Sequence, residues 1–258
     1  MCIRDRLRAG RVSRHAEWTR SPGSGICRVG FKRHPSDSEG GLRLPDWDDL
    51  LKREEYHWRE PHPSVVGLAR ELRDRSLTRV LDLGCGAGRH TAYLSELGLS
   101  VVGMDPAASG LMRTVAWLRS EGLPRMLVRS DMRAVPFKTG SFDCVVSIYV
   151  LHHGTAAMIA RAFQEIRRIL VPGGVLLAVV QSTEDWKYGS GRLVERDTYI
   201  PQMGDEAGVL HHFFDRRGVK DLLHGFSIRR IAAERRDEGL PGNLSIRHGH
   251  WDVLAERQ

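Results

Sequence analysis

Val80-Leu81-Asp82-Leu83-Gly84-Cys85-Gly86-Ala87-Gly88-Arg89-His90 is the most informative stretch of the chain. Its apolar beginning predicts a buried strand. Glycine at three alternate positions predicts a tight turn that lets the backbone approach a ligand closely, because no Cβ intervenes. The residues that follow predict the start of a helix, whose first N–H groups and positive dipole end favour an anionic group. We therefore expect a ligand site where this strand ends.

Two further acids follow apolar runs downstream. Asp105 ends the run that begins at Leu99, and Asp131 comes shortly after the run 126–128. With Asp82, they recur at intervals of about 25 residues, which is typical of βαβ units in a parallel sheet. Because the carboxyl ends of parallel strands meet at one edge, we expect the three carboxylates to lie near one another. Alternatives remain: Asp105 as a helix N-cap, and Asp131 in a plain surface turn.

The glycine spacing separates two classes of cofactor. Dinucleotide-binding folds use G-x-G-x-x-G, whereas this chain has G-x-G-x-G preceded by Asp82. The segment resembles the first motif of class I S-adenosylmethionine-dependent methyltransferases. The resemblance implies that Asp82 contacts the amino-acid part of S-adenosylmethionine, that Asp105 binds the ribose, and that Asp131 and Met132 bind adenine. The expected cofactor residues are Asp82, Gly84, Cys85, Gly86, Gly88, Asp105, Pro106, Asp131, Met132 and Ser147.

The resemblance covers about residues 45–258 and implies one α/β domain. We expect a Rossmann-like, mostly parallel seven-stranded sheet with helices on both faces and an antiparallel last strand. The near-continuous apolar run 141–151 suits a central strand, and two apolar runs at 226–234 and 250–256 suit a closing hairpin. An amphipathic helix is predicted from Asp46 to Trp58, with Asp46 or its neighbour as the cap.

Residues 1–44 differ from the rest of the chain. They are rich in Arg, Gly, Ser and Pro and have no apolar period, so we predict a disordered or non-native extension. The opening, Met1 to Arg6, resembles translated sequencing-adapter DNA; an arginine-rich transit or RNA-binding arm is the alternative. The extension holds ten Lys/Arg and four Asp/Glu, which leaves 29 basic and 28 acidic residues for the remainder. The nearly neutral body argues against a polyanionic substrate.

Cysteine usage and hydropathy bear on the compartment. The four cysteines form no C-x-x-C pair, so we expect neither disulfides nor a zinc site, and a cytoplasmic location. No run approaches the ~20 apolar residues of a membrane span, so no membrane partner is expected.

Two regions supply candidates for chemistry and for acceptor recognition. Tyr149, His152 and His153 follow the central strand, where the resemblance places the transferable methyl group. A histidine there can accept a proton from the acceptor, although simple positioning is the alternative. Residues 181–213 interrupt the βα rhythm and predict a cap, since such loops vary specificity. The candidate acceptor contacts are Tyr56, Trp58, Trp186, Tyr188 and His211.

The expected activity is transfer of a methyl group from S-adenosylmethionine to a small molecule by direct displacement. Segment 147–153 also resembles wobble-uridine enzymes, so a tRNA methyltransferase is the first alternative. A non-catalytic cofactor-binding partner subunit and an NAD-dependent reductase are the others. Several histidines lie on two loops, but no spacing among them matches a ligand set, so we expect no metal. The oligomeric state stays open.

Overall fold

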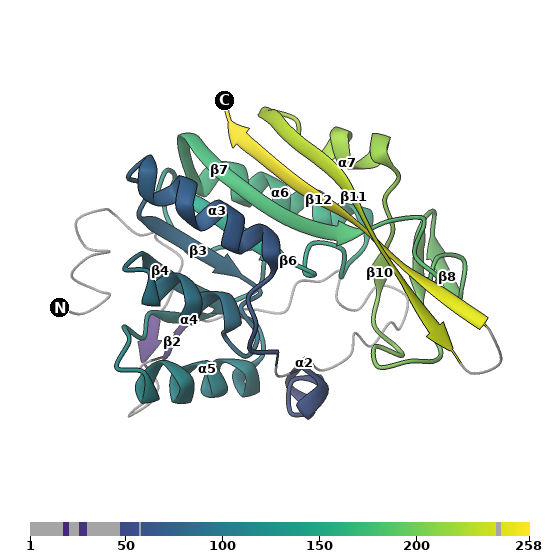
Figure 1. The fold of residues 1–258 in the computed structure, drawn as a ribbon, viewed down its shortest axis with the longest axis horizontal. Coiled ribbons are helices and arrows are strands. Elements are labelled where there is room, and N and C mark those ends of the chain that lie inside the picture. Colours follow the sequence, from purple (N-terminus) through teal and green to yellow (C-terminus); the bar gives the residue numbers. More distant parts are fainter. Residues whose placement is uncertain (1–17, 21–25, 30–46, 57, 241–243) are drawn as a thin grey trace.

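A mixed nine-stranded sheet forms the centre of the protein in a computed structural model, which describes residues 18–20, 26–29, 47–56, 58–240 and 244–258 (Figure 1). Its strand order is β1-β2-β5-β4-β3-β6-β7-β12-β11. These strands are β1 (Trp18–Arg20), β2 (Ile26–Val29), β3 (Arg79–Leu83), β4 (Ser100–Asp105), β5 (Leu127–Arg129), β6 (Phe142–Ile148), β7 (Leu170–Gln181), β11 (Phe226–Leu240) and β12 (Leu244–Arg257).

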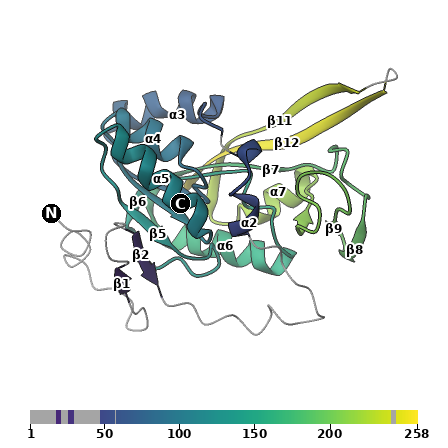
Figure 2. The same ribbon diagram turned by 90° about the horizontal axis from the view of Figure 1, so that it is seen from below.

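The predicted sheet is confirmed within this larger one. Strands β5, β4, β3, β6 and β7 are mutually parallel, and β12 pairs with β7 in the antiparallel sense. β11 then forms a hairpin with β12 that is longer than predicted, because the strands continue to Leu240 and from Leu244. Figure 2 shows this hairpin extending beyond the rest of the sheet.

Helices cover both faces of the sheet. α3 (Pro63–Asp74), α4 (Arg89–Glu96) and α5 (Ala108–Ser120) lie on one face, and α6 (Ala156–Ile169) and α7 (Arg216–Leu222) on the other (Figure 2). The central strand β6 is buried throughout because it contributes to both cores: Val145 packs with α6, whereas Cys144 and Val146 pack with α3. Thr155 and Asp215 cap α6 and α7 through their side chains.

Two predictions about the N-terminal part need correction. Residues 18–20 and 26–29 lie in the extension predicted to be disordered or non-native, yet they form strands, and β2 pairs with β5 in parallel. The physical reason is the burial of an apolar side chain: Ile26 is 6% exposed and packs in a core with Leu111 and Leu127. The single helix predicted over 46–58 is instead α2 (Trp47–Leu50) and a 3-10 turn, η2 (Glu54–Tyr56). The proposed cap Asp46 lies outside the described residues.

The predicted cap region 181–213 forms a small separate sheet. Its strands are β8 (Arg192–Glu195), β9 (Thr198–Ile200) and β10 (His211–His212), all antiparallel to their neighbours. The backbone of His212 donates a hydrogen bond to the carbonyl of His152, at 2.8 Å. This bond joins the cap to the loop that follows β6, so the cap is anchored where the parallel strands end.

Candidate active site

The glycine turn between β3 and α4 requires glycine at two positions, each for the same two reasons. Gly84 and Gly88 have φ of 77° and 92°, a region that other residues rarely adopt. A Cβ on Gly84 would lie 2.2 Å from Cγ2 of Val150, and one on Gly88 would lie 2.6 Å from Cγ2 of Thr114. The turn therefore combines left-handed backbone with close packing against Val150 and Thr114.

A cavity of about 380 Å³ lies in front of this turn, at the carboxyl ends of the parallel strands. Its size is in the ~300–1,000 Å³ range of small-molecule sites. The structure brings most of the predicted site residues to its walls. These are Tyr56, Trp58, Gly84, Cys85, Gly86, Gly88, Asp105, Pro106, Asp131, Met132, Tyr149 and His153.

Three other predicted residues lie beneath this wall rather than on it. Asp82 is 1% exposed and accepts a hydrogen bond of 2.6 Å from the Thr91 hydroxyl. Ser147 is fully buried, and its hydroxyl donates to the Leu83 carbonyl at 3.2 Å. His152, 2% exposed, lies behind His153. Asp82 and Ser147 thus support the glycine turn from below.

The candidate acceptor contacts in the cap divide differently. Tyr188 is 38% exposed, and its hydroxyl donates to Asp197 within the cap at 2.8 Å. Trp186 is away from the cavity walls, and its buried Nε1 has no hydrogen-bond partner among the described residues. His211 is fully buried beside His153, with ring centroids 4.8 Å apart. Only His211 of these three is therefore close to a residue of the cavity wall.

Asp105 and Asp131 both line the cavity, but their carboxylates have different hydrogen-bond partners. Asp105 accepts hydrogen bonds from the backbone N–H groups of Gly86 and Ala107, at 2.9 and 2.8 Å. Burial raises its pKa to about 6, against the lowering effect of these two donors. Asp105 is not the N-cap of the following helix, which was its alternative role, because the N-cap of α5 is Ala107. Asp131 is already paired with Arg133, whose Nε and backbone N–H both lie 2.8 Å from Oδ1.

Arg89 is a cavity residue that the sequence reasoning missed. Its guanidinium lies over the rings of Trp58 and Tyr149, 4.8 and 6.0 Å from their centroids. Among the described residues, no carboxylate lies within ion-pair distance of it. Burial lowers its pKa, although a guanidinium stays charged at neutral pH. The sequence feature that could have identified Arg89 is its position directly after Gly88, the last glycine of the turn. The cavity thus contains an unpaired cation next to the N-terminus of α4, whose N-cap, Gly88, provides no side-chain hydrogen bond.

Two segments close the outer side of the cavity. Asp48 of α2 bonds to the first turn of α5, where its Oδ1 accepts from the Ser109 backbone N–H at 2.7 Å. Leu51 packs 3.8 Å from the position that a Cβ of Gly86 would take. From the opposite side, the cap contributes Glu206, Val209 and Leu210 to the cavity wall.

The two covering segments also bond to each other. The Tyr56 hydroxyl and the Arg53 guanidinium both donate to the backbone carbonyl of Asp205, at 3.0 and 3.3 Å. The predicted cap role of residues 181–213 therefore has a geometric basis, and it involves a segment from the N-terminal side of the domain as a second half of the cover.

The candidate acid–base residues are held in their neutral forms. Burial raises the pKa of Tyr149 to about 12, so its phenol is protonated at neutral pH. Tyr149 has φ of 60°, a strained conformation for a non-glycine residue at a strand end. Burial and the neighbouring His211 lower the pKa of His153 to about 3, so its ring is an uncharged imidazole. Burial likewise lowers the pKa of His152.

Glu206, which lines the cavity from the cap, is held as a carboxylate. Burial opposes its ionisation, but a hydrogen bond from His211 and the positive charge of Lys187 lower its pKa overall. The acceptor end of the cavity therefore combines two neutral histidines, a protonated phenol and one buried carboxylate. This set can orient and hydrogen-bond an acceptor without itself becoming covalently modified.

Comparison with known proteins gives the family. A relative from Encephalitozoon cuniculi, named only as a methyltransferase, is 40% identical over 177 residues, which are 67% of this chain and 76% of the relative. The chain belongs to the methyltransferase family. A family profile described as a methyltransferase domain also matches residues 81–178. The methyltransferase is S-adenosylmethionine-dependent, and the prediction of its class and cofactor is confirmed.

Two further comparisons concern its fold and the breadth of its relatives. A solved structure of an S-adenosylmethionine-dependent methyltransferase from Methanosarcina mazei matches with a TM-score of 0.60 at 21% identity, covering 77% of this chain and 98% of that one. It shares the fold. The human relative named as a probable tRNA methyltransferase 9B is 34% identical over 123 residues. The match covers 47% of this chain and only 25% of that relative.

The residues of this site fit the cofactor. Gly84 and Gly88 add no side chain to the turn, the N-cap of α4 provides no side-chain hydrogen bond, and among the described residues Arg89 has no carboxylate within ion-pair distance. These features suit an amino-acid carboxylate. Asp105 offers a carboxylate at the tip of β4, which suits paired hydroxyl groups. Of the helices described in the structure, none has the length and apolar character needed to cross a membrane.

Proposed function

We propose that the methyltransferase transfers a methyl group to a small-molecule acceptor by direct displacement. The observation that carries this proposal is the double cover: the N-terminal segment and the cap meet over the cavity through Tyr56, Arg53 and the Asp205 carbonyl. A partly covered site of about 380 Å³ suits a small acceptor better than a base that belongs to a folded polynucleotide.

The charge of the cap supports the same proposal. Residues 181–213 contain six acidic and three basic residues, so the segment nearest the acceptor has a net charge of −3. Binding of a polyanion rests on neutralising phosphates with Lys and Arg. An acidic cover works against this, and most of the net positive charge of the chain lies in the N-terminal extension instead, which has ten Lys/Arg and four Asp/Glu.

We assign roles to the cavity residues on the same basis. Arg89 and the N-terminus of α4 would hold the carboxylate of the cofactor, Asp105 its ribose, and Asp131 with Met132 its adenine. Cys85 and Pro106 line the passage between these groups, whereas Asp82 and Ser147 would act through the turn they support. When bound, S-adenosylmethionine supplies an electrophilic methyl group on a sulfonium.

The chain's own contribution would be alignment and exclusion of water. Holding the acceptor atom in line at ~3 Å supplies much of the rate enhancement of a displacement, and the covered cavity favours a step in which charge is dispersed. Tyr149 can donate a hydrogen bond to the acceptor. His153, whose pKa burial lowers to about 3, is too weak a base to accept the proton of a hydroxyl or an amine, so its role would be to position the acceptor.

The test is methyl transfer from labelled S-adenosylmethionine to a panel of phenols, thiols and amines, with bulk tRNA in parallel reactions. We expect label in at least one small molecule and none in tRNA. We also expect no salt-dependent retention of tRNA, because the body of the protein is nearly neutral. Label in tRNA would replace the proposal with the alternative that the human relative suggests. Cofactor binding without transfer to either class would favour the non-catalytic partner subunit.

A further inference from the structure

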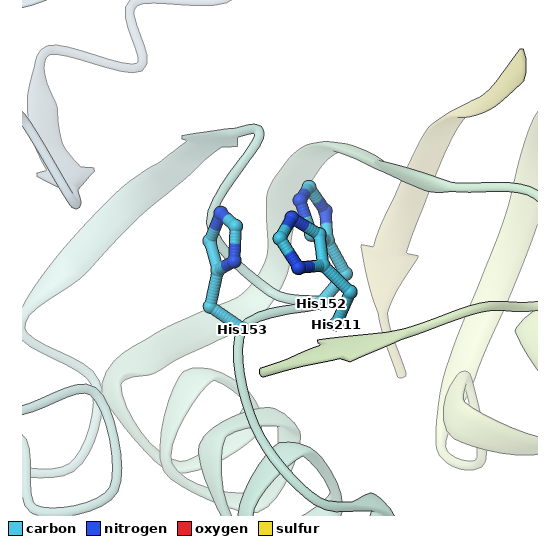
Figure 3. A group of neighbouring side chains, drawn as sticks. All are labelled: His152, His153 and His211. Carbon is cyan, nitrogen blue, oxygen red and sulfur yellow. The ribbon is translucent and has the colours of Figure 1, made fainter. Parts of the chain in front are cut away.

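Three histidine rings from distant parts of the chain meet at the cap end of the cavity. His152 and His153 belong to the loop after β6, and His211 begins β10; Figure 3 shows the rings standing together. One nitrogen of each lies within 4.8 Å of the others. His152 is 2% exposed and His211 fully buried, and the side chain of His153 is 9% exposed.

Two ring nitrogens of these histidines lack a hydrogen-bond partner among the described residues. Nδ1 of His152 and Nδ1 of His153 are buried and have no hydrogen-bond partner among the described residues. Buried polar atoms are almost always paired, so an unpaired one calls for a ligand or another specific explanation. In the tautomer with the proton on Nε2, each Nδ1 presents a lone pair, and with ring centroids 4.2 Å apart the two rings can share one electron-poor ligand.

The contacts of His211 indicate the same kind of ligand. Its Nδ1 lies 3.0 Å from the Val209 carbonyl and its Nε2 lies 2.9 Å from Oε2 of Glu206. Both partners are oxygens that only accept. A neutral ring has one proton and can donate to only one of them. With that proton on Nδ1 and donated to Val209, Nε2 and the Glu206 carboxylate both present lone pairs that a cation can bind. The other oxygen of Glu206 lies 4.0 Å from Nε2 of His153.

We propose that His152, His153 and His211, with Glu206, bind one divalent transition-metal ion of the zinc class. Imidazole nitrogens with one carboxylate suit zinc, cobalt or iron and not magnesium or calcium. Zinc–nitrogen bonds of ~2.0–2.1 Å place ligand atoms ~3.3 Å apart in a tetrahedron. The rings therefore move closer together when the ion binds, and Lys187, 2.8 Å from Oε2 of Glu206, keeps its ion pair on the outer side.

The location gives the ion a structural and a chemical consequence. It would join the loop after β6 to the cap, two elements already connected by the hydrogen bond from His212 to His152. His153 and Glu206 also line the cavity, so the ion would lie at its wall. The assignment does not depend on which acceptor is methylated, because every ligand group belongs to the chain itself.

The test uses the full chain, purified without a histidine tag and treated with a chelator. We expect calorimetry to give one equivalent of bound Zn²⁺, and Co²⁺ to give the visible absorption of a nitrogen-ligated, low-coordinate site, whereas Mg²⁺ and Ca²⁺ give neither. The loss of affinity in His153→Ala and in His211→Ala should exceed the ~10–100-fold that removal of an outer hydrogen-bond partner costs.

A matched control lies next to the cluster. His212 follows His211 on β10, but its ring bonds to the Thr198 hydroxyl at 2.6 Å, outside the cluster. His212→Ala should therefore keep both the stoichiometry and the affinity. Glu206→Gln, which keeps the size of the side chain, tests the carboxylate if a histidine variant fails to fold. The proposal is overturned if the unmodified protein shows no saturable Zn²⁺ binding, or if His212→Ala weakens binding as much as His211→Ala.

Discussion

The hydroxyl of Tyr56 donates a 3.0 Å hydrogen bond to the backbone carbonyl of Asp205, across the mouth of the cavity. The two residues come from opposite ends of the domain in sequence, and their bond connects the N-terminal segment to the cap. Burial and the nearby acids Glu206 and Asp205 raise the pKa of Tyr56, so the hydroxyl keeps its proton and remains a donor at every physiological pH. The closed form of the site thus depends on a few specific bonds.

Loss of this bond should speed release of the bound cofactor. We expect Tyr56→Phe to raise the dissociation rate of S-adenosylhomocysteine by about 2–10-fold, corresponding to the ~0.5–1.5 kcal/mol of one hydrogen bond. Stopped-flow displacement measures the rate. Tyr188→Phe is the control, because the Tyr188 hydroxyl bonds to Asp197 inside the cap and joins no second segment. Equal effects in both variants would show that the bridge over the cavity has no special role.

Cofactor affinity should fall when the pH drops below about 6. Burial, opposed by the backbone donors of Ala107 and Gly86, raises the pKa of Asp105 to about 6. Below that pH the carboxyl group is increasingly protonated, and a protonated group loses one of the acceptor sites that ribose hydroxyls need. We expect Kd for S-adenosylmethionine to rise as pH falls from 7 to 5 and to level off above 7.

The variant Asp105→Ala separates this effect from other titrations. It should weaken cofactor binding at pH 7.5 by about 1–3 kcal/mol and remove most of the dependence near pH 6. Calorimetry at several pH values measures both quantities. Burial also raises the pKa of Asp82 to about 6, so Asp82→Asn is the comparison. An unchanged affinity in Asp105→Ala would show that the ribose lies elsewhere.

Substitution by alanine should destabilise the protein more at Gly84 than at Gly98, which has a similar backbone conformation but open space around it. Gly98 has φ of 82° with nothing within 4 Å of an added Cβ, whereas on Gly84 that atom would meet Val150. We expect Gly98→Ala to lower the free energy of unfolding by about 1–2 kcal/mol, the cost of the left-handed conformation, and Gly84→Ala to lower it more. Val150→Ala should recover part of the difference, since it removes the two closest atoms. Denaturant titration of the single and double variants measures this coupling.

Arg89 should recognise the amino-acid end of the cofactor. We expect Arg89→Gln to weaken S-adenosylmethionine and S-adenosylhomocysteine by about 1.5–3 kcal/mol, because charge-assisted hydrogen bonds to the carboxylate are lost. Methylthioadenosine, which lacks that carboxylate, should bind the variant and the unmodified protein equally. A loss of turnover with unchanged affinity for all three ligands would instead assign Arg89 to an anionic acceptor.

Local patterns were sufficient to predict most of the residues of the glycine turn and the strand ends that line the cavity. The alternation of glycine in 84–88 and the acids that follow apolar runs are encoded within short segments, and the βαβ topology then places their ends together. The antiparallel β12 agrees with what the resemblance implied for the last strand. Asp82 shows the limit of this reasoning: it lies next to the turn in sequence, but its carboxylate points to Thr91.

The acceptor side depends on contacts between segments that no short pattern connects. Glu206 and His211 reach His153 only because the cap folds back over the loop after β6, as the bond between the backbones of His212 and His152 requires. Tyr188 shows the converse case, since an aromatic residue in the cap was expected near the acceptor and instead bonds to Asp197 at the surface. The prediction about metal binding used only the spacing of histidines in the sequence, and that spacing does not show which histidines the fold brings together.

Strand β2 has a practical consequence for shortening the protein. Ile26 pairs with Leu127 along the outer side of β5, and its side chain completes the core under α5. A chain that begins at residue 45 would leave β5 as a bare sheet edge, with unpaired backbone groups and an uncovered apolar patch. Such edges promote pairing between molecules. Self-association of a shortened chain should therefore be read as the loss of this strand, and not as a natural oligomer.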